Sequence, residues 1–180
     1  FIQVSGNTNA GVPGALSQSY LQKENYLSAA TLIARGVTSN SFDGAIDYDV
    51  NGNMIAGFDV QVYAAGLRNP FDLVLHSNGR LYGTDNGPNL KFGGKSLSCT
   101  EDGPEPFHKD KLVLLEEGSF YGHANRKRGE TDPRQCIWRD FYEKSEGYTG
   151  PIRKLQSSTN GICEFQSDHF GGTLRGQLIL

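Results

Sequence analysis

The chain has 180 residues and a net charge of −3, and it is long enough to form one domain with a sizeable core. Its 23 glycines and 37% hydrophobic content indicate many turns and short regular elements. The charge is spread along the chain, which argues against a nucleic-acid partner. No apolar run approaches the ~20 residues that span a bilayer, so we expect no transmembrane segment.

The first half of the chain has the pattern of short strands separated by polar turns. The runs at 1–4 and 178–180 resemble strand interiors, so we expect a piece of a longer protein that is truncated at both ends. Weak helical spacing at 16–23 predicts one or two helical turns. Strands are expected over 27–34, 46–50, 54–58 and 60–64, with Asn51-Gly52-Asn53 as a hairpin turn.

The clearest element is a hairpin whose apolar runs, 72–76 and 81–84, flank Asn78-Gly79. This pair favours a tight hairpin turn because both residues tolerate positive φ. A hairpin brings its outer ends together, so the loop Arg68-Asn69 should lie beside the loop Asn86-Gly87-Pro88. The sequence therefore predicts that a fixed cation, an amide and several backbone carbonyls converge at one point.

The rest of the chain alternates irregular segments with short apolar runs. Turn glycines at Gly79, Gly118 and Gly161 recur about every 40 residues, which is the length of a four-stranded propeller blade. Short strands with little helix predict an all-β sandwich, barrel or propeller. Further strands are expected over 111–115, 152–155, 162–166 and 174–180, and polar loops over 90–109 and 126–135.

The three cysteines lack the spacing of a metal site. Cys99 and Cys136 flank a stretch rich in glycine, proline and charge, and a disulfide between them would close a long surface loop. Such a closure is worth ~3–4 kcal/mol. Alternatively, all three are small apolar residues in a reducing compartment. If the disulfide forms, Cys163 remains free or pairs outside this chain.

Several short segments along the chain carry a resemblance to known proteins. They are SGNTNAG (5–11), AGLRNPF (65–71), NGRLY (78–82), TDNGPN (84–89), FYGH (120–123), NRKRG (125–129) and FGGTLRG (170–176). They occur in one order, cover nearly the whole chain, and together resemble one family, the soluble quinoprotein glucose/sorbosone dehydrogenases. The chain is most similar to the branch with sorbosone dehydrogenase-like proteins and fungal pyranose dehydrogenases that depend on pyrroloquinoline quinone (PQQ).

The resemblance implies a fold, an activity and a location. Residues 1–180 would form a partial propeller domain, roughly three blades of a six-bladed β-propeller. The family oxidises a sugar hydroxyl by hydride transfer to PQQ, which is held with a calcium ion, and passes the electrons to an external acceptor. We therefore expect a sugar substrate, PQQ and Ca²⁺ as cofactors, and a secreted protein.

The resemblance also assigns roles to particular residues. Arg68, Asn69 and Asn86 match positions that contact the quinone, and the backbone carbonyls of Gly87 and Pro88 match calcium ligands. An always-charged guanidinium suits a carboxylated, electron-accepting ring. Asn7 falls roughly where the family has a polar side chain near the sugar.

Other family features lie outside this chain or differ within it. The family's catalytic base is a histidine that would lie upstream of Phe1, just before the segment that matches 1–11, so no catalytic residue is expected in this chain. The basic residues that grip the quinone from late blades would follow Leu180. Phe92 stands where some relatives carry an acid, and Ala124 replaces a turn proline.

Alternatives to the enzyme hypothesis remain open. The chain could be a non-catalytic binding propeller with a degenerate cofactor pocket. A calcium-dependent hydrolase would need carboxylate ligands, for which Asp85 is the single candidate. Asp85 could instead support Arg68 or be an ordinary turn residue. His123 is expected to be structural, and His76 and the cluster Arg126-Lys127-Arg128 are expected at the surface.

Overall fold

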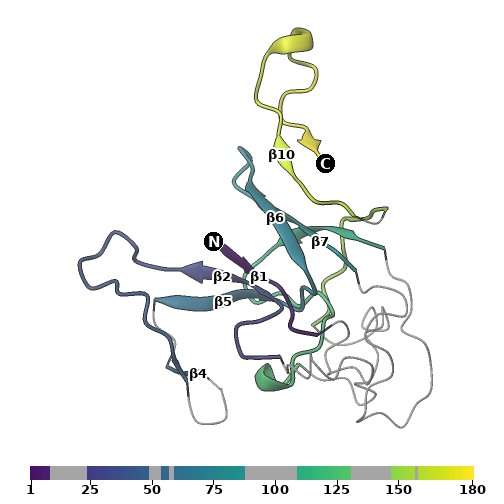
Figure 1. Ribbon diagram of the computed structural model, residues 1–180. Helices are drawn as coiled ribbons and strands as arrows, with labels where there is room; N and C mark the ends of the chain where they lie inside the picture. Colours follow the sequence, from purple (N-terminus) through teal and green to yellow (C-terminus); the bar gives the residue numbers. More distant parts are fainter. Residues whose placement is uncertain (9–23, 49–53, 57–58, 88–108, 131–146, 157) are drawn as a thin grey trace, which may run out of the picture.

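The structure is a computed structural model that describes residues 1–8, 24–48, 54–56, 59–87, 109–130, 147–156 and 158–180 (Figure 1). Within these ranges, regular structure consists of short β-strands and two 3-10 helices. None of the helices in the described ranges is long and apolar enough to cross a bilayer. The prediction of an all-β chain is thus confirmed for this part of the sequence.

A three-stranded antiparallel sheet carries the N-terminal strand at its edge. It contains β1 (Ile2–Val4), β2 (Ala30–Ala34) and β5 (Val60–Ala65) in the order β1-β2-β5. Side chains of these strands, among them Leu32 and Val60, are buried and form a small apolar cluster. The strands predicted over 27–34 and 60–64 are confirmed, although β2 begins only at Ala30.

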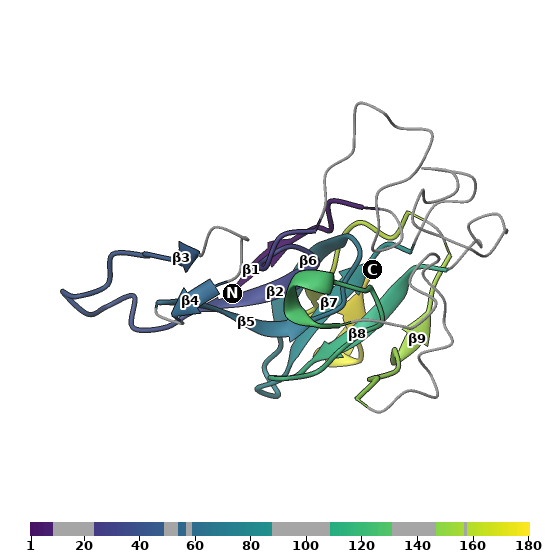
Figure 2. The same cartoon turned by 90° about the horizontal axis from the view of Figure 1, so that it is seen from below.

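A four-stranded antiparallel meander follows directly in the sequence (Figure 2). Its strands, in spatial and chain order, are β6 (Pro70–Leu75), β7 (Leu81–Asp85), β8 (Lys111–Leu115) and β9 (Arg153–Lys154). Buried side chains of β7 and β8 form the second apolar cluster together with side chains from β5 and from two loops. It contains Ala64, Leu67, Leu81, Val113, Leu115 and Tyr121.

The turn of the central hairpin differs from the predicted one. Gly79 has a φ of +80°, but Asn78 does not adopt a positive φ. A longer connection joins the strands, and it is closed by hydrogen bonds between His76 and Arg80 and between Gly79 and His76. The Asn78 side chain accepts a hydrogen bond from the Arg80 N–H at 2.9 Å, so asparagine serves this turn through its side chain rather than its backbone.

Two further hairpins complete the described structure. β3 (Asp47–Tyr48) pairs with β4 (Met54–Ala56), as the sequence predicts. β10 (Cys163–Glu164) pairs with β11 (Leu178–Ile179), and this hairpin projects from the rest of the chain (Figure 1). β11 is shorter than predicted, because a 3-10 turn at His169–Gly172 with left-handed backbone precedes it. The helical turns predicted at 16–23 lie outside the described residues.

His76 joins the β10–β11 hairpin to the central hairpin, so the prediction that it lies at the surface is wrong. Its Nε2 lies 2.9 Å from the Gly176 carbonyl, and its Nδ1 accepts the Asn78 N–H at 3.0 Å. The Glu164 carboxylate accepts hydrogen bonds from both the hydroxyl and the N–H of Ser77, which lower its pKa. These contacts attach the tip of β6 to β10.

We expect Glu164→Ala to release the β10–β11 hairpin without unfolding the four-stranded sheet. Amide hydrogen exchange at Phe165 and Gln177 should become about ten-fold faster, whereas the amides of β7 and β8 should be unchanged. Asp168→Ala is the matched control, because its ion pair with Arg175 is exposed within the same hairpin. Equal exchange rates in the two variants would show that Glu164 does not hold the hairpin.

Candidate functional site

The two loops at the outer ends of the central hairpin converge, as predicted. Arg68 Nη1 donates a hydrogen bond to the Gly87 carbonyl at 3.2 Å. The Asn86 N–H donates to the Asn69 carbonyl at 3.0 Å, and Asn69 Nδ2 donates to Asn86 Oδ1 at 3.2 Å. These contacts bring a cation, two side-chain amides and a backbone carbonyl together at or near the surface. We call this group of Arg68, Asn69, Asn86 and Gly87 the junction.

Asp85 supports the Arg68-Asn69 loop from inside the protein. The residue is 1% exposed, and its Oδ1 accepts the Asn69 N–H at 2.8 Å. Burial raises the pKa of this carboxyl group, while the opposing charge of Lys111 on β8 and the backbone N–H of Asn69 counteract the rise. Because this carboxylate faces the protein interior, it is poorly placed as the ligand that a calcium-dependent hydrolase would need.

Asp110 also belongs to the site, although the sequence analysis did not predict it. Its buried carboxylate accepts hydrogen bonds from Asn86 Nδ2 at 2.7 Å, the Gly87 N–H at 3.1 Å and the Thr159 N–H at 2.9 Å. A signal for it exists in the sequence, because Asp110 directly precedes the apolar run of β8. In an antiparallel pair, the residue before β8 must lie beside the residue after β7.

The N-terminal loop lies against the same residues. The Gly6 N–H donates to the Arg68 carbonyl at 2.7 Å, and the Ser5 hydroxyl donates to Asn69 Oδ1 at 2.7 Å. Asn7 is exposed and follows directly, with its backbone N–H held on Glu24 at 3.0 Å. The structure thus brings the segment around Asn7 to the converged loops, while its role toward a sugar stays a prediction.

Phe1 lies at the far end of β1 from the converged loops. Its ring is 47% exposed and packs edge-on against Tyr63 of β5, with 4.8 Å between the ring centroids. The chain then runs along β1 to Ser5, which contacts Asn69, so Phe1 is about 13 Å of strand away from the site. The histidine that the family resemblance places upstream of Phe1 lies outside this chain and stays a prediction.

A buried contact between Glu24 and His123 underlies the N-terminal loop. His123 Nε2 lies 3.0 Å from Glu24 Oε1, and the two side chains are 0% and 2% exposed. Burial opposes the charge on Glu24, but hydrogen bonds from His123, Ser28 and Thr8 outweigh it and lower its pKa to about 2. The packing is close, since a Cβ on Gly6 would lie 2.9 Å from the His123 ring. His123 is therefore a packed structural residue, as expected.

Arg128 is not a solvated surface residue, contrary to the prediction for the basic cluster. Its guanidinium donates to the carbonyls of Tyr26, Ser28 and Ala29, and its side chain pairs with Glu130. The short 3-10 helix Arg126–Arg128 aims this side chain inward. Arg128 thus holds residues 26–29, which follow Glu24 closely, and it stabilises the part of the chain that underlies the N-terminal loop.

Other predicted site residues are not tested by these contacts. Pro88, Cys99 and Cys136 lie outside the described residues, so the calcium role of Pro88 and the disulfide stay predictions. Cys163 is an exposed free thiol. Among the described residues, no group of three or more His, Cys, Asp or Glu side chains could hold a metal ion by itself.

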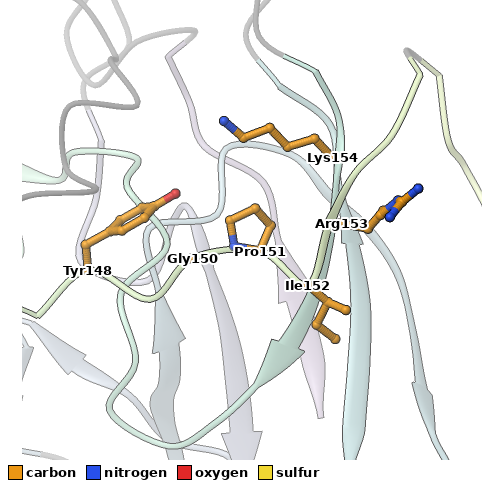
Figure 3. A pocket seen from close by; sticks show the side chains of 6 residues that line it. All are labelled: Tyr148, Gly150, Pro151, Ile152, Arg153 and Lys154. Carbon is orange, nitrogen blue, oxygen red and sulfur yellow. The ribbon is translucent and has the colours of Figure 1, made fainter.

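A surface pocket of about 520 Å³ lies along β9, the strand that pairs with β8 (Figure 3). Its lining alternates in direction, with Lys154 and Arg153 pointing to opposite sides of the strand. The lining contains none of the residues that the sequence assigns to the cofactor, although Lys154 pairs with Lys111, which in turn pairs with Asp85. Its lining residues are Tyr148, Gly150, Pro151, Ile152, Arg153 and Lys154.

Comparison with known proteins gives a distant structural match. No protein-family model matches the chain, and a search of curated proteins finds no match. Among solved structures, the chain is similar to the soluble aldose sugar dehydrogenase of Escherichia coli, crystallised in the apo-form. The match has 18% sequence identity and a TM-score of 0.41, and it covers 69% of this chain. It spans 32% of that enzyme's chain, and likeness at this level establishes neither a family nor an activity.

Proposed function

We propose that this chain is part of a PQQ- and calcium-dependent sugar dehydrogenase built on a six-bladed β-propeller. The observation that carries the proposal is the junction of Arg68 and Gly87, flanked by the paired amides of Asn69 and Asn86. Described residues from three of the segments that resemble the quinoprotein family, 5–11, 65–71 and 84–89, meet there. When bound, the quinone supplies the acceptor for a hydride from the sugar hydroxyl.

The charge of the junction suits an anionic cofactor. Arg68 keeps its positive charge at all physiological pH values and is fixed between β6 and the Gly87 loop. It would bind the cofactor's carboxylates or oxygens and stabilise negative charge that develops on them. The amides of Asn69 and Asn86 would orient the ring by hydrogen bonding.

The described residues fit a calcium ion only in combination with the bound quinone. Calcium takes about six to eight oxygen ligands, and the described residues supply the Gly87 carbonyl but no carboxylate cluster. A carbonyl oxygen has two lone pairs, so it can accept from Arg68 and bind a cation. A guanidinium beside a calcium ion is repulsive unless negative charge lies near both. We therefore expect calcium to bind weakly alone and much more tightly together with the quinone.

The test is a titration of quinone into the full-length protein with and without calcium, followed by absorbance or calorimetry. Arg68→Ala should weaken quinone binding about 10- to 100-fold, since it removes a charge-assisted interaction. Arg80→Ala is the matched control, because Arg80 lies exposed at the opposite end of the same hairpin and should leave binding unchanged. Dye reduction with a panel of aldoses and osones then tests catalysis.

Two outcomes would redirect the proposal. Quinone binding without dye reduction by any sugar would favour a binding propeller over an enzyme. No binding of quinone by the wild-type full-length protein would reject the cofactor assignment for Arg68, Asn69 and Asn86. Retained affinity in Arg68→Ala would reject the role of that residue alone.

A further inference from the structure

The hydrogen-bond partners of Asp110 determine which groups donate and which accept throughout the junction. All three partners, Asn86 Nδ2 and the N–H groups of Gly87 and Thr159, are donors. Both oxygens of the carboxylate therefore act as acceptors. Asn86 must turn its nitrogen toward Asp110, which leaves its oxygen pointing toward the neighbouring loop.

The same constraint passes to the next two residues. Because Asn86 presents its oxygen, Asn69 must donate with its Nδ2, and this contact is 3.2 Å long. Asn69 then presents its own oxygen to Ser5, whose hydroxyl donates to it at 2.7 Å. Asn86 Nδ2 also donates to the Thr159 carbonyl, at the longer distance of 3.3 Å. The buried acid, supported by this carbonyl, thus sets the orientation of two amides and one hydroxyl, which an isolated pair of asparagines would not fix.

Asp110 also controls the residue that carries the candidate calcium ligand. It holds the Gly87 N–H at 3.1 Å, while the Gly87 carbonyl receives Arg68 from the other side. Gly87 has no side chain to restrict its backbone, so these two contacts restrain the direction of its carbonyl. Thr159, from the segment after β9, is tied to the same carboxylate and adds rigidity.

We propose that Asp110 is the positioning residue of the candidate cofactor site, an inference that rests on the proposed function. It acts through Asn86, Asn69 and Gly87 and does not itself touch the cofactor. Its carboxylate determines where the oxygen and the nitrogen of each side-chain amide point, and it restrains the direction of the Gly87 carbonyl. A sequence motif centred on the two loops does not include it, because it comes from a separate strand.

The test compares Asp110→Asn with Asp110→Glu in the full-length protein. Asn places a donor against Asn86 Nδ2 or a backbone N–H, and Glu keeps the charge but moves the carboxylate by one methylene. Both variants should bind PQQ with calcium about 10- to 100-fold more weakly. Asp72→Asn is the matched control, since the Asp72 carboxylate accepts the N–H groups of Leu73 and Ile162 and not those of the junction residues. Its PQQ affinity should equal that of the wild type.

A second measurement separates this inference from the proposed function. The side-chain NH₂ signals of Asn69 in NMR spectra should shift in Asp110→Asn but not in Asp72→Asn, although Asp110 does not contact Asn69. If the wild type binds no PQQ, the proposed function fails, and the NMR result alone decides whether Asp110 orients the amides. Unmoved Asn69 signals, or wild-type PQQ affinity in Asp110→Glu, would overturn the positioning role.

Discussion

Glu24→Gln should cost about 3 kcal/mol of unfolding free energy at neutral pH, and the loss should disappear on acidification. The pKa of Glu24 is about 2 in the folded chain against an ordinary value of 4.5. One pKa unit corresponds to about 1.4 kcal/mol, which gives the expected size. Because the folded pKa is depressed, the stabilisation is complete above about pH 4.5 and is lost as the pH falls toward 2.

The measurement is urea unfolding of the wild type and the variant between pH 2 and pH 7. The difference between the two curves separates Glu24 from Asp85, whose raised pKa acts in both proteins. It also includes a smaller contribution from Glu130, because the charge on Glu24 helps to raise the pKa of Glu130. Glu117→Gln is the matched control, since Glu117 pairs with Arg35 at the exposed surface. It should change stability by under about 1 kcal/mol. A Glu24 difference that stays constant with pH would show that the charge on Glu24 is not the source of stability.

The Glu24–His123 pair also illustrates why sequence reasoning found only half of the site. The central hairpin could be predicted because its signals are local: alternating apolar residues, a turn glycine and two polar loops at matching ends. Convergence of Arg68 with Gly87 followed from hairpin geometry alone. Glu24 and His123 are 99 positions apart and belong to no periodic pattern, so nothing near either residue points to the other.

The directions of individual side chains, like contacts between distant residues, could not be predicted from the sequence. Arg128 and its two basic neighbours have the composition of a solvated cluster, but a 3-10 turn directs Arg128 onto three backbone carbonyls. His76 was expected at the surface because it ends a strand beside a turn. It is instead covered because the β10–β11 hairpin returns to that turn from about 100 residues downstream.

Asp110 was predictable in part. The strand register that places Lys111 opposite Asp85 also places Asp110 beside Asn86, and both strands were predicted. Their pairing across residues 88–108 was not, because a long irregular segment separates them. A polar residue flanking a predicted strand is therefore informative once the neighbouring strand is known, and uninformative before that.

Gly66→Ala should be among the most destabilising single substitutions in the described chain. Gly66 has a φ of +79°, and a Cβ there would lie 2.6 Å from ring carbons of Phe120 and 2.7 Å from the Gly122 nitrogen. Left-handed backbone costs about 1–2 kcal/mol for a residue with a Cβ. Overpacking adds about 1–3 kcal/mol, so the expected loss in unfolding free energy is about 2–5 kcal/mol.

Gly79→Ala separates the two contributions to that loss. Gly79 has nearly the same φ, +80°, but a Cβ there would meet nothing within 4 Å. It should therefore lose only the backbone part, about 1–2 kcal/mol. In a Phe120→Ala background, Gly66→Ala should cost less than in the wild type, because the ring that it strikes is gone. Equal costs for Gly66→Ala and Gly79→Ala would show that the chain beside Phe120 can shift. Arg68 would then be held less rigidly than its contacts indicate, because Gly66 is the point from which its loop departs.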